Sequence, residues 1–215
     1  VKTFTKGKEK IHAINGITLD IEQQSFTVVM GPSGSGKSTL LNLIAGLDRP
    51  TSGEILLKGI NMTKLTYDEL CDIRRHEIGI IFQFFYMHEG LTALQNIEYP
   101  MLIVGRKKEE RKARAKNLLK YVDLGNKSDF LPNQLSGGEL QRLGIARALA
   151  NDPDVIIADE PTGNLDSSLT KNIITLFSQL MKDLHKTIIM VTHDESLLTE
   201  DMSIVHLVDG KISPT

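Results

Sequence analysis

The first residues whose types and spacing could do chemistry lie in one glycine-rich segment. Residues 31–38 read Gly-Pro-Ser-Gly-Ser-Gly-Lys-Ser and fit the pattern Gly-x-x-x-x-Gly-Lys-Ser/Thr at every required position. Glycines allow successive backbone N–H groups to face phosphate oxygens, and a following helix would direct its positive N-terminus at the same anion. Lys37 would supply a mobile charge for the β- and γ-phosphates, and Ser38 would offer its hydroxyl to Mg²⁺. We therefore expect a phosphate-binding loop formed by Gly31, Pro32, Ser33, Gly34, Ser35, Gly36, Lys37, Ser38 and Thr39.

An acidic pair follows a strongly apolar run. Residues 155–158 read Val-Ile-Ile-Ala, and Asp159 and Glu160 come next. Open α/β sheets bind their ligands at the carboxyl ends of the strands, so a buried strand here would bring both carboxylates to such an edge. Asp159 is suited to hold Mg²⁺ through water, and Glu160 is suited to orient or deprotonate an attacking water. Together with the glycine-rich loop, the pair predicts a site for phosphoryl chemistry.

Strand-like and helix-like segments alternate along most of the chain and favour an α/β sheet fold. The alternation of Ile17, Leu19 and Ile21 with polar neighbours predicts a half-buried strand over 17–22. Thr66 and Glu69 form a capping-box pattern at the start of a short helix. Further strands are expected at 25–30, 78–82, 155–158, 187–192 and 204–208, and helices at 37–45, 66–74, 91–120, from Ser136 and from about Ser168.

The length of 215 residues predicts one large domain or a domain with a grafted lobe, and the composition is typical of a globular protein. Of 215 residues, 40% are hydrophobic and 24% are charged, which excludes a disordered or fibrous chain. No apolar stretch reaches the ~20 residues of a membrane-spanning helix, no stretch has the pattern of a secretory signal, and the single Cys71 fits a reducing cytoplasm. The net charge of -2 argues against a dedicated nucleic-acid binder. The basic residues within 106–116 suggest a solvated helix face, with a membrane-surface or nucleic-acid patch as the alternative.

Three more short features follow or open predicted elements. Gln83 comes directly after the strand expected at 78–82, and His193 comes directly after the strand expected at 187–192. Residues 135–139 read Leu-Ser-Gly-Gly-Glu, which puts two glycines at the start of a helix and gives a second N-terminus receptive to an anion. Together with the glycine-rich loop and the acidic pair, these motifs resemble those of the ATP-binding subunit of an ABC transporter. The resemblance covers nearly all of the chain.

The resemblance implies a fold and its cofactors. It implies an α/β P-loop NTPase (RecA-like) core with an N-terminal antiparallel β subdomain and an inserted α-helical subdomain. Residues 1–215 would form a single ABC ATPase domain, with 1–83 and 136–215 as the catalytic core with the β subdomain and about 84–135 as the helical subdomain. The cofactors would be ATP and Mg²⁺, with two ATP molecules held between the subunits of a head-to-tail homodimer.

The resemblance also assigns residues to the dimer interface. The segment 135–139 would be the signature that faces the glycine-rich loop of the opposite subunit. Ser136 and Gly138, with Gly137 between them, would therefore contact the γ-phosphate that the other subunit binds. Residues 164–166, which read Asn-Leu-Asp, would form the loop that couples the two sites across the interface.

Further roles implied by the resemblance concern the nucleotide within one subunit. Gln83 would sense Mg²⁺ and the lytic water, and His193 would contact the γ-phosphate. Phe4 stands where the family has an aromatic residue that stacks on adenine. The implied catalytic set is Glu160, His193, Gln83 and Lys37, the metal set is Ser38, Gln83 and Asp159, and the nucleotide-binding set adds Phe4, Ser136, Gly137, Gly138 and Asp166 to residues 31–39.

Finer details resemble one group of ABC transporters. Residues 91–96, 111–115 and 162–166 look like those of the MacB/LolD/FtsE type, whose members pair with a separate or fused FtsX-like permease. The resemblance implies export or extrusion of a lipoprotein or peptide, by a cytoplasmic subunit held at the inner face of the cell membrane through the permease. The alternative is an FtsE-like ATPase that transmits a conformational signal across the membrane without transporting cargo.

Two positions depart from the pattern of this group. Residues 84–90 read Phe-Phe-Tyr-Met-His-Glu-Gly in place of the more usual Gln-Phe-Asn-Leu-x-Pro type, and Leu140 stands where a second glutamine is common. In the family, the segment after Gln83 faces the cleft that receives a helix of the permease, and aromatic residues with methionine suit such a groove. A docking surface and ordinary core packing are both open as interpretations of Phe84, Phe85, Tyr86 and Met87.

One motif suggests a different class of protein. Residues 126–129 read Asn-Lys-Ser-Asp, the guanine-reading pattern of GTPases, but they follow a predicted helix rather than a buried strand. A GTPase would also have Asp-x-x-Gly after a strand, and no aspartate in this sequence has a glycine three residues later. We therefore interpret residues 126–129 as a chance match. The stretch between Ser38 and Ser136 has no heptad run, which argues against an SMC-type ATPase, and a two-cassette translation factor is excluded by the single glycine-rich loop.

Overall fold

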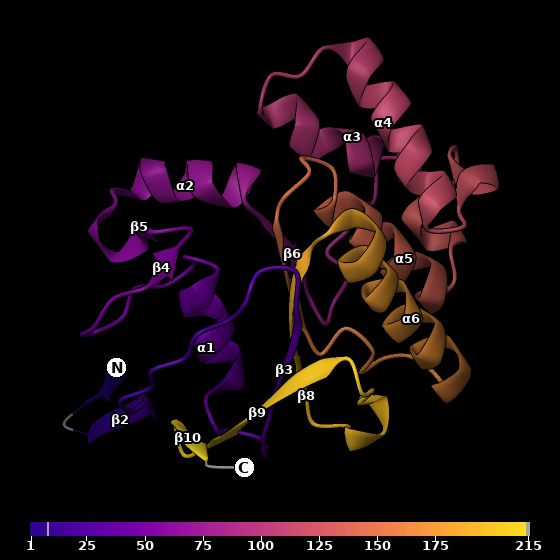
Figure 1. Cartoon of the computed structure of the whole chain (residues 1–215). Coiled ribbons are helices and arrows are strands. Elements are labelled where there is room, and N and C mark those ends of the chain that lie inside the picture. The colour runs from indigo at the N-terminus through magenta and orange to yellow at the C-terminus, as the bar shows by residue number, and fades with distance from the viewer. Residues whose placement is uncertain (8, 214–215) are drawn as a thin grey trace.

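Six strands form the central sheet of the computed structural model, which describes residues 1–7 and 9–213. They are β3 (Phe26–Met30), β6 (Ile78–Ile81), β7 (Val155–Asp159), β8 (Thr187–Thr192), β9 (Met202–Val208) and β10 (Lys211–Ser213). The order across the sheet is β10-β9-β3-β8-β7-β6, and all neighbouring pairs are parallel except β10 with β9 (Figure 1). The parallel strands therefore end at one edge of the sheet, where open α/β folds bind ligands.

Helices cover both faces of the sheet and bury its apolar strands (Figure 1). α1 (Lys37–Ile44) lies on one face, and α5 (Gly137–Ala148) and α6 (Ser167–Leu184) lie on the other. Successive strand residues point to opposite faces, so Ile157 joins the core cluster around α1 while Ile156 joins the cluster around α5 and α6. The alternation of strands and helices predicted from the sequence is confirmed.

Two antiparallel hairpins precede and follow α1 in the chain. The first pairs β1 (Lys2–Lys6) with β2 (Glu9–Ile14), and the second pairs β4 (Leu56–Leu57) with β5 (Ile60–Asn61). Neither hairpin belongs to the six-stranded sheet. They provide the antiparallel β structure that was expected near the N-terminus.

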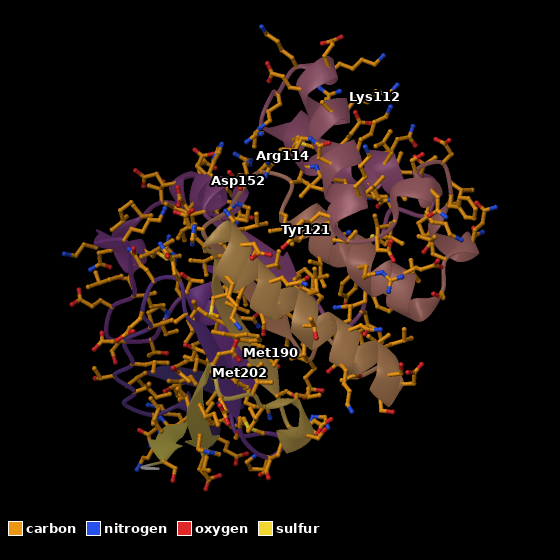
Figure 2. The ribbon with its side chains drawn as sticks, turned by 45° about the vertical axis from the view of Figure 1, so that its right-hand side comes forward. Lys112, Arg114, Tyr121, Asp152, Met190 and Met202 are labelled. Atoms are coloured by element: carbon orange, nitrogen blue, oxygen red, sulfur yellow. The ribbon has the colours of Figure 1, made fainter. Side chains whose placement is uncertain are left out.

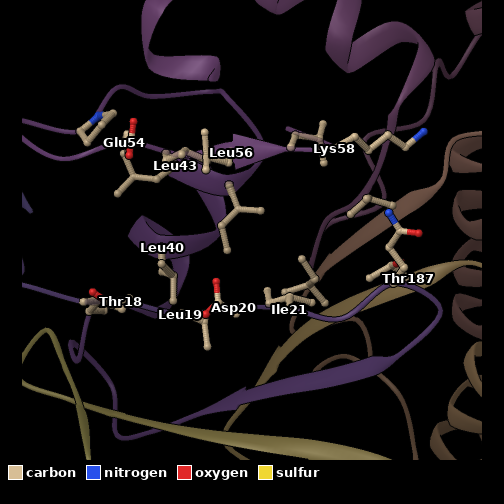
Figure 3. A pocket seen from close by; sticks show the side chains of 18 of the residues that line it. Thr18, Leu19, Asp20, Ile21, Leu40, Leu43, Glu54, Leu56, Lys58 and Thr187 are labelled. Atoms are coloured by element: carbon tan, nitrogen blue, oxygen red, sulfur yellow. The ribbon is translucent and has the colours of Figure 1, made fainter. Parts of the chain in front are cut away.

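The strand expected over residues 17–22 is wrong, because these residues pair with no strand in the structure. Ile17, Leu19 and Ile21 are nevertheless half-buried, and their polar neighbours are exposed, so the alternation correctly marks a covered face. The segment forms one wall of a cavity of about 860 Å³ that α1 and β4 complete (Figure 3). Because the cavity separates the segment from β4, the two backbones form no hydrogen-bonded ladder.

The helical insert between β6 and α5 consists of α3 (Ala93–Ile103) and α4 (Lys108–Tyr121), at the top right of Figure 1. The single helical stretch expected over 91–120 is therefore two helices. They separate at Gly105, whose φ of +77° is a left-handed conformation that ends a helix. The predicted boundaries of the helical subdomain, about 84 and 135, stay a prediction.

The remaining helical elements are short. α2 (Tyr67–His76) begins at the capping box predicted from Thr66 and Glu69, whose side chain accepts from the Thr66 N–H at 2.7 Å. Single 3₁₀ turns are formed by Met62–Lys64, Gly125–Lys127, Pro132–Gln134 and Glu195–Leu197. Within residues 1–7 and 9–213, no helix has the length and apolar character needed to cross a bilayer.

The basic residues around α4 divide into two kinds. The Arg114 guanidinium donates to the carbonyl oxygens of Ala150 at 2.7 Å and Leu149 at 2.9 Å, and it lies 3.2 Å from the Asp152 carboxylate (Figure 2). Lys112, on the same helix, is exposed. Arg114 thus fastens the insert to the core while the lysine meets solvent, which supports the interpretation of a solvated helix face.

Candidate functional site

The glycine-rich loop connects the end of β3 to the start of α1, at the carboxyl edge of the sheet. Gly31 and Gly36 have φ values of +157° and +103°. A Cβ at Gly31 would lie 2.0 Å from the carbonyl oxygen of Leu207, and one at Gly36 would lie 2.3 Å from that of Ala13. Only glycine allows the loop to pass this close to β9 and β2, so packing explains both glycines that the motif requires.

Two polar groups of this loop, the Lys37 ammonium and the Ser35 hydroxyl, form no hydrogen bond to a charged acceptor within the described residues. The Lys37 ammonium is buried and donates to the carbonyl oxygens of Gly31 and Pro32, at 2.8 Å each. The buried Ser35 hydroxyl has no hydrogen-bond partner among the residues that the structure describes. An oxyanion in the loop would give the ammonium and the hydroxyl a charged acceptor, so the loop fits a phosphate group.

Ser38 and Asp159 meet beside the loop, although they are 121 positions apart in the chain. The Ser38 hydroxyl donates to Asp159 Oδ1 at 3.2 Å. Burial raises the pKa of the Asp159 carboxyl and the charge of Glu160 adds to the rise, while the hydrogen bond from Ser38 opposes it. A cation here would offset both unfavourable causes.

The donor atoms at this corner suit Mg²⁺, which binds carboxylate and hydroxyl oxygens and completes its shell with water and phosphate. In the described part of the chain, no three histidine, cysteine, aspartate or glutamate side chains gather into a metal site. Ser38 and Asp159 alone would therefore leave most positions around the ion to water and to a nucleotide. This arrangement is the one by which magnesium enters phosphoryl-transfer sites.

Glu160 and His193 come together at the ends of two adjacent parallel strands. Glu160 Oε1 lies 3.1 Å from His193 Nδ1. Glu160 has a left-handed backbone, with φ of +44°, and its N–H donates to the carbonyl oxygen of Val191 at 3.0 Å. The contact follows from the sheet order, because β7 and β8 are neighbours and both residues follow the last residue of their strand. A carboxylate held at this edge, beside the phosphate loop, is placed to accept a proton from water.

Gln83 lies against the turn that follows Glu160. Its backbone carbonyl oxygen accepts from Asn164 Nδ2 at 3.1 Å. Its side-chain nitrogen lies 3.3 Å from the position that a Cβ on Gly163 would take, and Glu160 Oε2 lies 3.7 Å from the same position. The structure thus brings Gln83 near Glu160. No hydrogen bond within the described residues joins Gln83 to Ser38 or Asp159, so its metal role stays a prediction.

The glycine pair at residues 137–138 begins α5 as expected. The Ser136 N–H donates to Glu139 Oε2 at 2.8 Å, and this hydrogen bond lowers the pKa of the Glu139 carboxyl. Gly138 is buried where a Cβ would lie 3.0 Å from a Leu169 methyl carbon. Ser136 itself is exposed. Between residues that the structure describes, no hydrogen bond or ion pair joins this helix start to the glycine-rich loop, because α5 and α1 lie on opposite faces of the sheet.

Comparison with known proteins gives this arrangement a family. The family model described as "ABC transporter" matches residues 14–163. The lipoprotein-releasing system ATP-binding protein LolD 1 of Chlorobium chlorochromatii is 48% identical over 201 residues, which are 93% of this chain and 82% of that protein. The chain belongs to the ABC transporter family.

Two more relatives extend the comparison of this ABC transporter subunit. The macrolide export ATP-binding/permease protein MacB of Aggregatibacter actinomycetemcomitans is 44% identical over 97% of the chain, which spans 32% of MacB. The structure of the ATP-binding cassette MJ0796, whose sequence is from Methanocaldococcus jannaschii, is a dimer in a post-hydrolysis state bound to ADP and Pi. It matches with a TM-score of 0.90 and 43% identity, over 99% of this chain and 94% of that one.

These matches confirm several expectations. The protein is an ABC ATP-binding subunit of the MacB/LolD-like group, and it has the α/β fold of a P-loop NTPase. It is an ATPase. The resemblance inferred from the motifs was therefore correct at the level of family, fold and reaction.

Phe4 and Asp166, two predicted nucleotide-binding residues, form no hydrogen bond with the glycine-rich loop, Asp159, Glu160 or His193 among the described residues. The Phe4 ring, on β1, is 43% exposed and lies 4.9 Å from the Lys2 ammonium, and its stacking on adenine stays a prediction. Asp166 caps the N-terminus of α6, where its Oδ1 accepts from the N–H groups of Ser168 and Leu169 at 2.9 Å each. The cap explains Asp166 by itself, and its role toward nucleotide stays a prediction.

Residues 84–87 are open to two interpretations, core packing and an exposed docking surface, and the structure partly buries only some of them. Met87 packs against the main core, and its Cε lies 3.5 Å from the position of a Cβ on Gly144. Phe84 and Tyr86 are 60% and 66% exposed, with ring centroids 6.3 Å apart. Met87 therefore belongs to the core, and the rings of Phe84 and Tyr86 form an exposed surface.

Sequence reasoning missed the residue that holds this segment in place. Arg147, in the last turn of α5, donates to the carbonyl oxygens of Tyr86 at 2.6 Å and Phe85 at 3.0 Å. Tyr86 has a left-handed backbone, with φ of +43°. An arginine near a helix C-terminus is common for electrostatic reasons, so its position carried no signal of this contact.

The GTPase-like motif lies in the helical insert of the cassette. Asn126 and Lys127 belong to the 3₁₀ turn Gly125–Lys127 rather than to the end of a sheet strand. The Lys127 ammonium lies 3.5 Å from Glu139 Oε1 and 4.4 Å from the centroid of the Phe130 ring. Lys127 thus contacts the start of α5, as a residue of the insert.

Proposed function

We propose that two copies of this ABC ATPase enclose two ATP molecules head to tail. Each ATP would lie between the glycine-rich loop of one copy and residues 136–138 of the other. One observation carries the proposal: the two anion-receptive elements of a single chain start on opposite faces of the sheet, and the Ser38–Asp159 pair that suits Mg²⁺ lies beside the loop. A two-fold partner would bring the exposed Ser136 and the positive end of α5 to the phosphates. The dimeric state of MJ0796 supports the arrangement.

Hydrolysis would use the contacts at the carboxyl edge of the sheet. Glu160 would orient or deprotonate the attacking water, and His193 would position Glu160 and contact the γ-phosphate. Lys37 would exchange its loop carbonyl partners for phosphate oxygens, where its charge stabilises the transferring phosphoryl group. Gln83, next to Glu160, would complete the catalytic set.

Binding of the nucleotide would use residues around this centre. Ser38 and Asp159, with Gln83, would hold Mg²⁺, which supplies positive charge to the phosphate oxygens when it is bound. Phe4 would stack on adenine, and Gly137 and Asp166 would lie at the dimer interface. ATP holds the halves together more strongly than ADP does because only ATP offers a γ-phosphate to both subunits.

We also propose that the dimer drives an FtsX/MacB-like membrane permease, for export or for extrusion of a lipoprotein or peptide. The relatives LolD, named for lipoprotein release, and MacB, named for macrolide export, support this choice. The exposed Phe84 and Tyr86 would lie at the docking surface, together with Phe85 and Met87. The subunit would then be cytoplasmic and held at the inner face of the membrane.

The test is the solution mass of Glu160→Gln, measured by light scattering with Mg-ATP, with Mg-ADP and without nucleotide. We expect a dimer with Mg-ATP only, since turnover that opens the dimer should fall by about 10²–10⁴-fold when the general base is removed. Lys37→Ala is the control that should not bind nucleotide and should stay monomeric. A Glu160→Gln protein that binds ATP and remains a monomer would contradict the dimer, and unchanged turnover would contradict the role of Glu160.

A further inference from the structure

The helical insert ends in the turn between α3 and α4, which projects from the rest of the molecule at the top of Figure 1. The N–H of Gly105 donates to the carbonyl oxygen of Leu102 at 3.0 Å. The N–H of Arg106 donates to the carbonyl oxygen of Met101 at 3.0 Å, so the turn folds back on the end of α3. A Cβ at Gly105 would meet no atom within 4 Å. The end of the insert is therefore open to another molecule or surface.

The basic side chains at this end divide into two kinds. Arg106 donates to the carbonyl oxygen of Asn151 at 3.3 Å, and Arg111 donates to that of Arg106 at 2.6 Å, so both arginines are engaged with the backbone. Among the described residues, the side chains of five exposed lysines form no hydrogen bond or ion pair: Lys107, Lys108, Lys112, Lys116 and Lys120. Between residues 107 and 120, only Glu109 and Glu110 bring negative charge. The outer side of α4 is thus positive, although the whole chain has a net charge of -2.

The end of the insert also exposes an apolar side chain. Leu102, in the last turn of α3, is 53% exposed, and the tight turn joins it to the start of α4. Lys112 lies one turn into α4, near the end of the insert in Figure 2. We call the surface formed by these side chains the insert tip, which consists of Leu102, Lys107, Lys108 and Lys112.

These side chains suit a surface of anionic lipid. Lysine ammonium groups keep their water while they face phosphates in the hydrated head-group layer, and an apolar side chain beside them enters that layer. The lysines then remain solvated, as they are in the free chain. A nucleic acid favours arginine, whose planar guanidinium pairs with phosphate through two parallel hydrogen bonds, but Arg106 and Arg111 are bound to backbone oxygens.

We infer that the insert tip contacts anionic phospholipids, with its three lysines facing the phosphates and Leu102 in the head-group layer. The inference rests on the proposed location of the subunit at the inner face of the membrane, and it adds a contact with the lipid to the docking on a permease. Each lysine at an anionic bilayer strengthens binding about fivefold. Three lysines give a weak contact by themselves, which becomes effective when a permease holds the chain near the membrane.

The first experiment measures sedimentation of the purified full chain with vesicles. One kind of vesicle contains equimolar phosphatidylcholine and phosphatidylglycerol, and the other contains phosphatidylcholine alone. We expect the wild-type chain to bind the anionic vesicles only. A triple variant of the insert tip combines Lys107→Gln, Lys108→Gln and Lys112→Gln. Its partition coefficient should be lower by more than about tenfold, because three attractive charges are lost.

A matched control separates the insert tip from the total charge of the chain. It removes the same charge at exposed positions elsewhere and combines Lys10→Gln, Lys64→Gln and Lys211→Gln. Its partition coefficient should stay within about twofold of the wild type, since charges beyond a Debye length of the bilayer are screened. Equal losses in the two triple variants, or no binding by the wild type, would overturn the inference.

The second experiment uses fluorescence, because the chain contains no tryptophan. Leu102→Trp introduces a single reporter at an exposed position of the insert tip. Its emission should move to shorter wavelength with the anionic vesicles and not with phosphatidylcholine, since the indole leaves water for the head-group layer. Leu47→Trp is the control, because Leu47 is 48% exposed and follows α1. No shift at position 102, or the same shift at position 47, would overturn the inference.

The remaining outcomes are also decisive. If the triple variant of the insert tip fails to fold, the two tryptophan variants still test the contact. Duplex DNA that displaces the vesicles from the wild type, and that the triple variant does not bind, would assign the tip to a nucleic acid and overturn the inference. Vesicle binding requires neither a permease nor nucleotide. Failure of the lipid contact, failure of the permease docking and failure of the ATP-dependent dimer are therefore separate results.

Discussion

Asp159 shows how one carboxylate of the site depends on its surroundings. It is half-buried, it accepts a hydrogen bond from Ser38, and its pKa is raised by burial and by the adjacent Glu160. The folded protein without ligand therefore holds a charge in an unfavourable place. Such an arrangement favours a bound cation, because the cation offsets the cost of keeping the carboxylate ionised.

Asp159→Asn should consequently stabilise the protein without nucleotide. The folded wild-type chain binds the Asp159 proton more tightly than the unfolded chain does, so its free energy of unfolding falls as pH rises from about 4 through the raised pKa. We expect the variant to have the higher melting temperature at pH 7 to 8 and the difference to shrink as the pH approaches 4. Thermal unfolding at several pH values, without Mg²⁺ and nucleotide, measures it. A lower melting temperature of the variant at pH 7 would contradict the unfavourable charge.

Asp159→Asn should also be stabilised less by Mg-ATP than the wild type is. Mg-ATP stabilises any protein that binds it in the folded state, and Asn offers a neutral and weaker ligand in place of the carboxylate. The Mg-ATP-dependent rise in melting temperature should therefore be clearly smaller for Asp159→Asn than for the wild type. Glu69→Gln serves as the control, since its carboxyl caps α2 and belongs to neither the loop nor the start of α5.

At the scale of elements, the helical insert is fastened to the core by a few specific contacts. Arg114 of α4 reaches the carbonyl oxygens of Leu149 and Ala150, which follow α5 and are buried. Arg147 of α5 reaches two carbonyls in the segment after β6. Arg114 binds backbone oxygens just after a helix, and Arg147 binds backbone oxygens of the loop after β6; both places lack the regular hydrogen-bond ladder of a helix or strand.

Arg114→Met should lower the free energy of unfolding by about 2 kcal/mol, the typical cost of losing hydrogen bonds from a charged donor to buried acceptors. Lys112→Met, an exposed change on the same helix, should stay within about 0.5 kcal/mol of the wild type. Urea unfolding of both variants measures the difference. Equal losses would mean that α4 does not depend on the Arg114 contacts.

At the scale of the whole molecule, the sheet separates two anion-receptive helix starts. α1 begins beside the carboxylates, and α5 begins on the other face, where Ser136 is exposed. One chain therefore presents two unlike surfaces that a two-fold dimer would join. The proposed dimer predicts that a charge at the start of α5 affects association and not the binding of nucleotide to a single chain.

Gly137→Asp, made in the Glu160→Gln background, tests this separation. A Cβ at Gly137 would meet only Leu165 Cδ2 at 3.7 Å, and an acidic residue in the first turn of a helix is favourable, so the fold should be kept. The new charge would face a γ-phosphate across the dimer. We expect the Mg-ATP dimer to weaken by more than about tenfold, the effect of one like-charge contact of a few kcal/mol, while ATP affinity of the monomer changes little.

Light scattering gives the association and calorimetry gives the affinity for ATP. Asn133→Asp adds the same charge at an exposed position before the helix and should still dimerise. An undiminished dimer of Gly137→Asp would place the start of α5 outside the interface.

The sequence by itself determined the features that depend on neighbouring residues. The glycine-rich loop, the capping box at Thr66, the helix start at Gly137 and the strand ends that carry Glu160 and His193 all follow from local spacing, since turn geometry and helix capping are local interactions. Family, fold and reaction followed from the combination of these motifs.

Only the tertiary structure decided which distant groups meet. Residues 17–22 have the alternation of a strand but face a cavity instead of a partner, because pairing requires another backbone at hydrogen-bonding distance. Arg147 meets Tyr86, and Ser38 meets Asp159, because the sheet order brings their elements to the same place. These contacts join residues that are far apart in the chain, so no local sequence pattern predicts them. They decide which charged side chains lack a charged partner, and we expect ligands and partners to bind at those side chains.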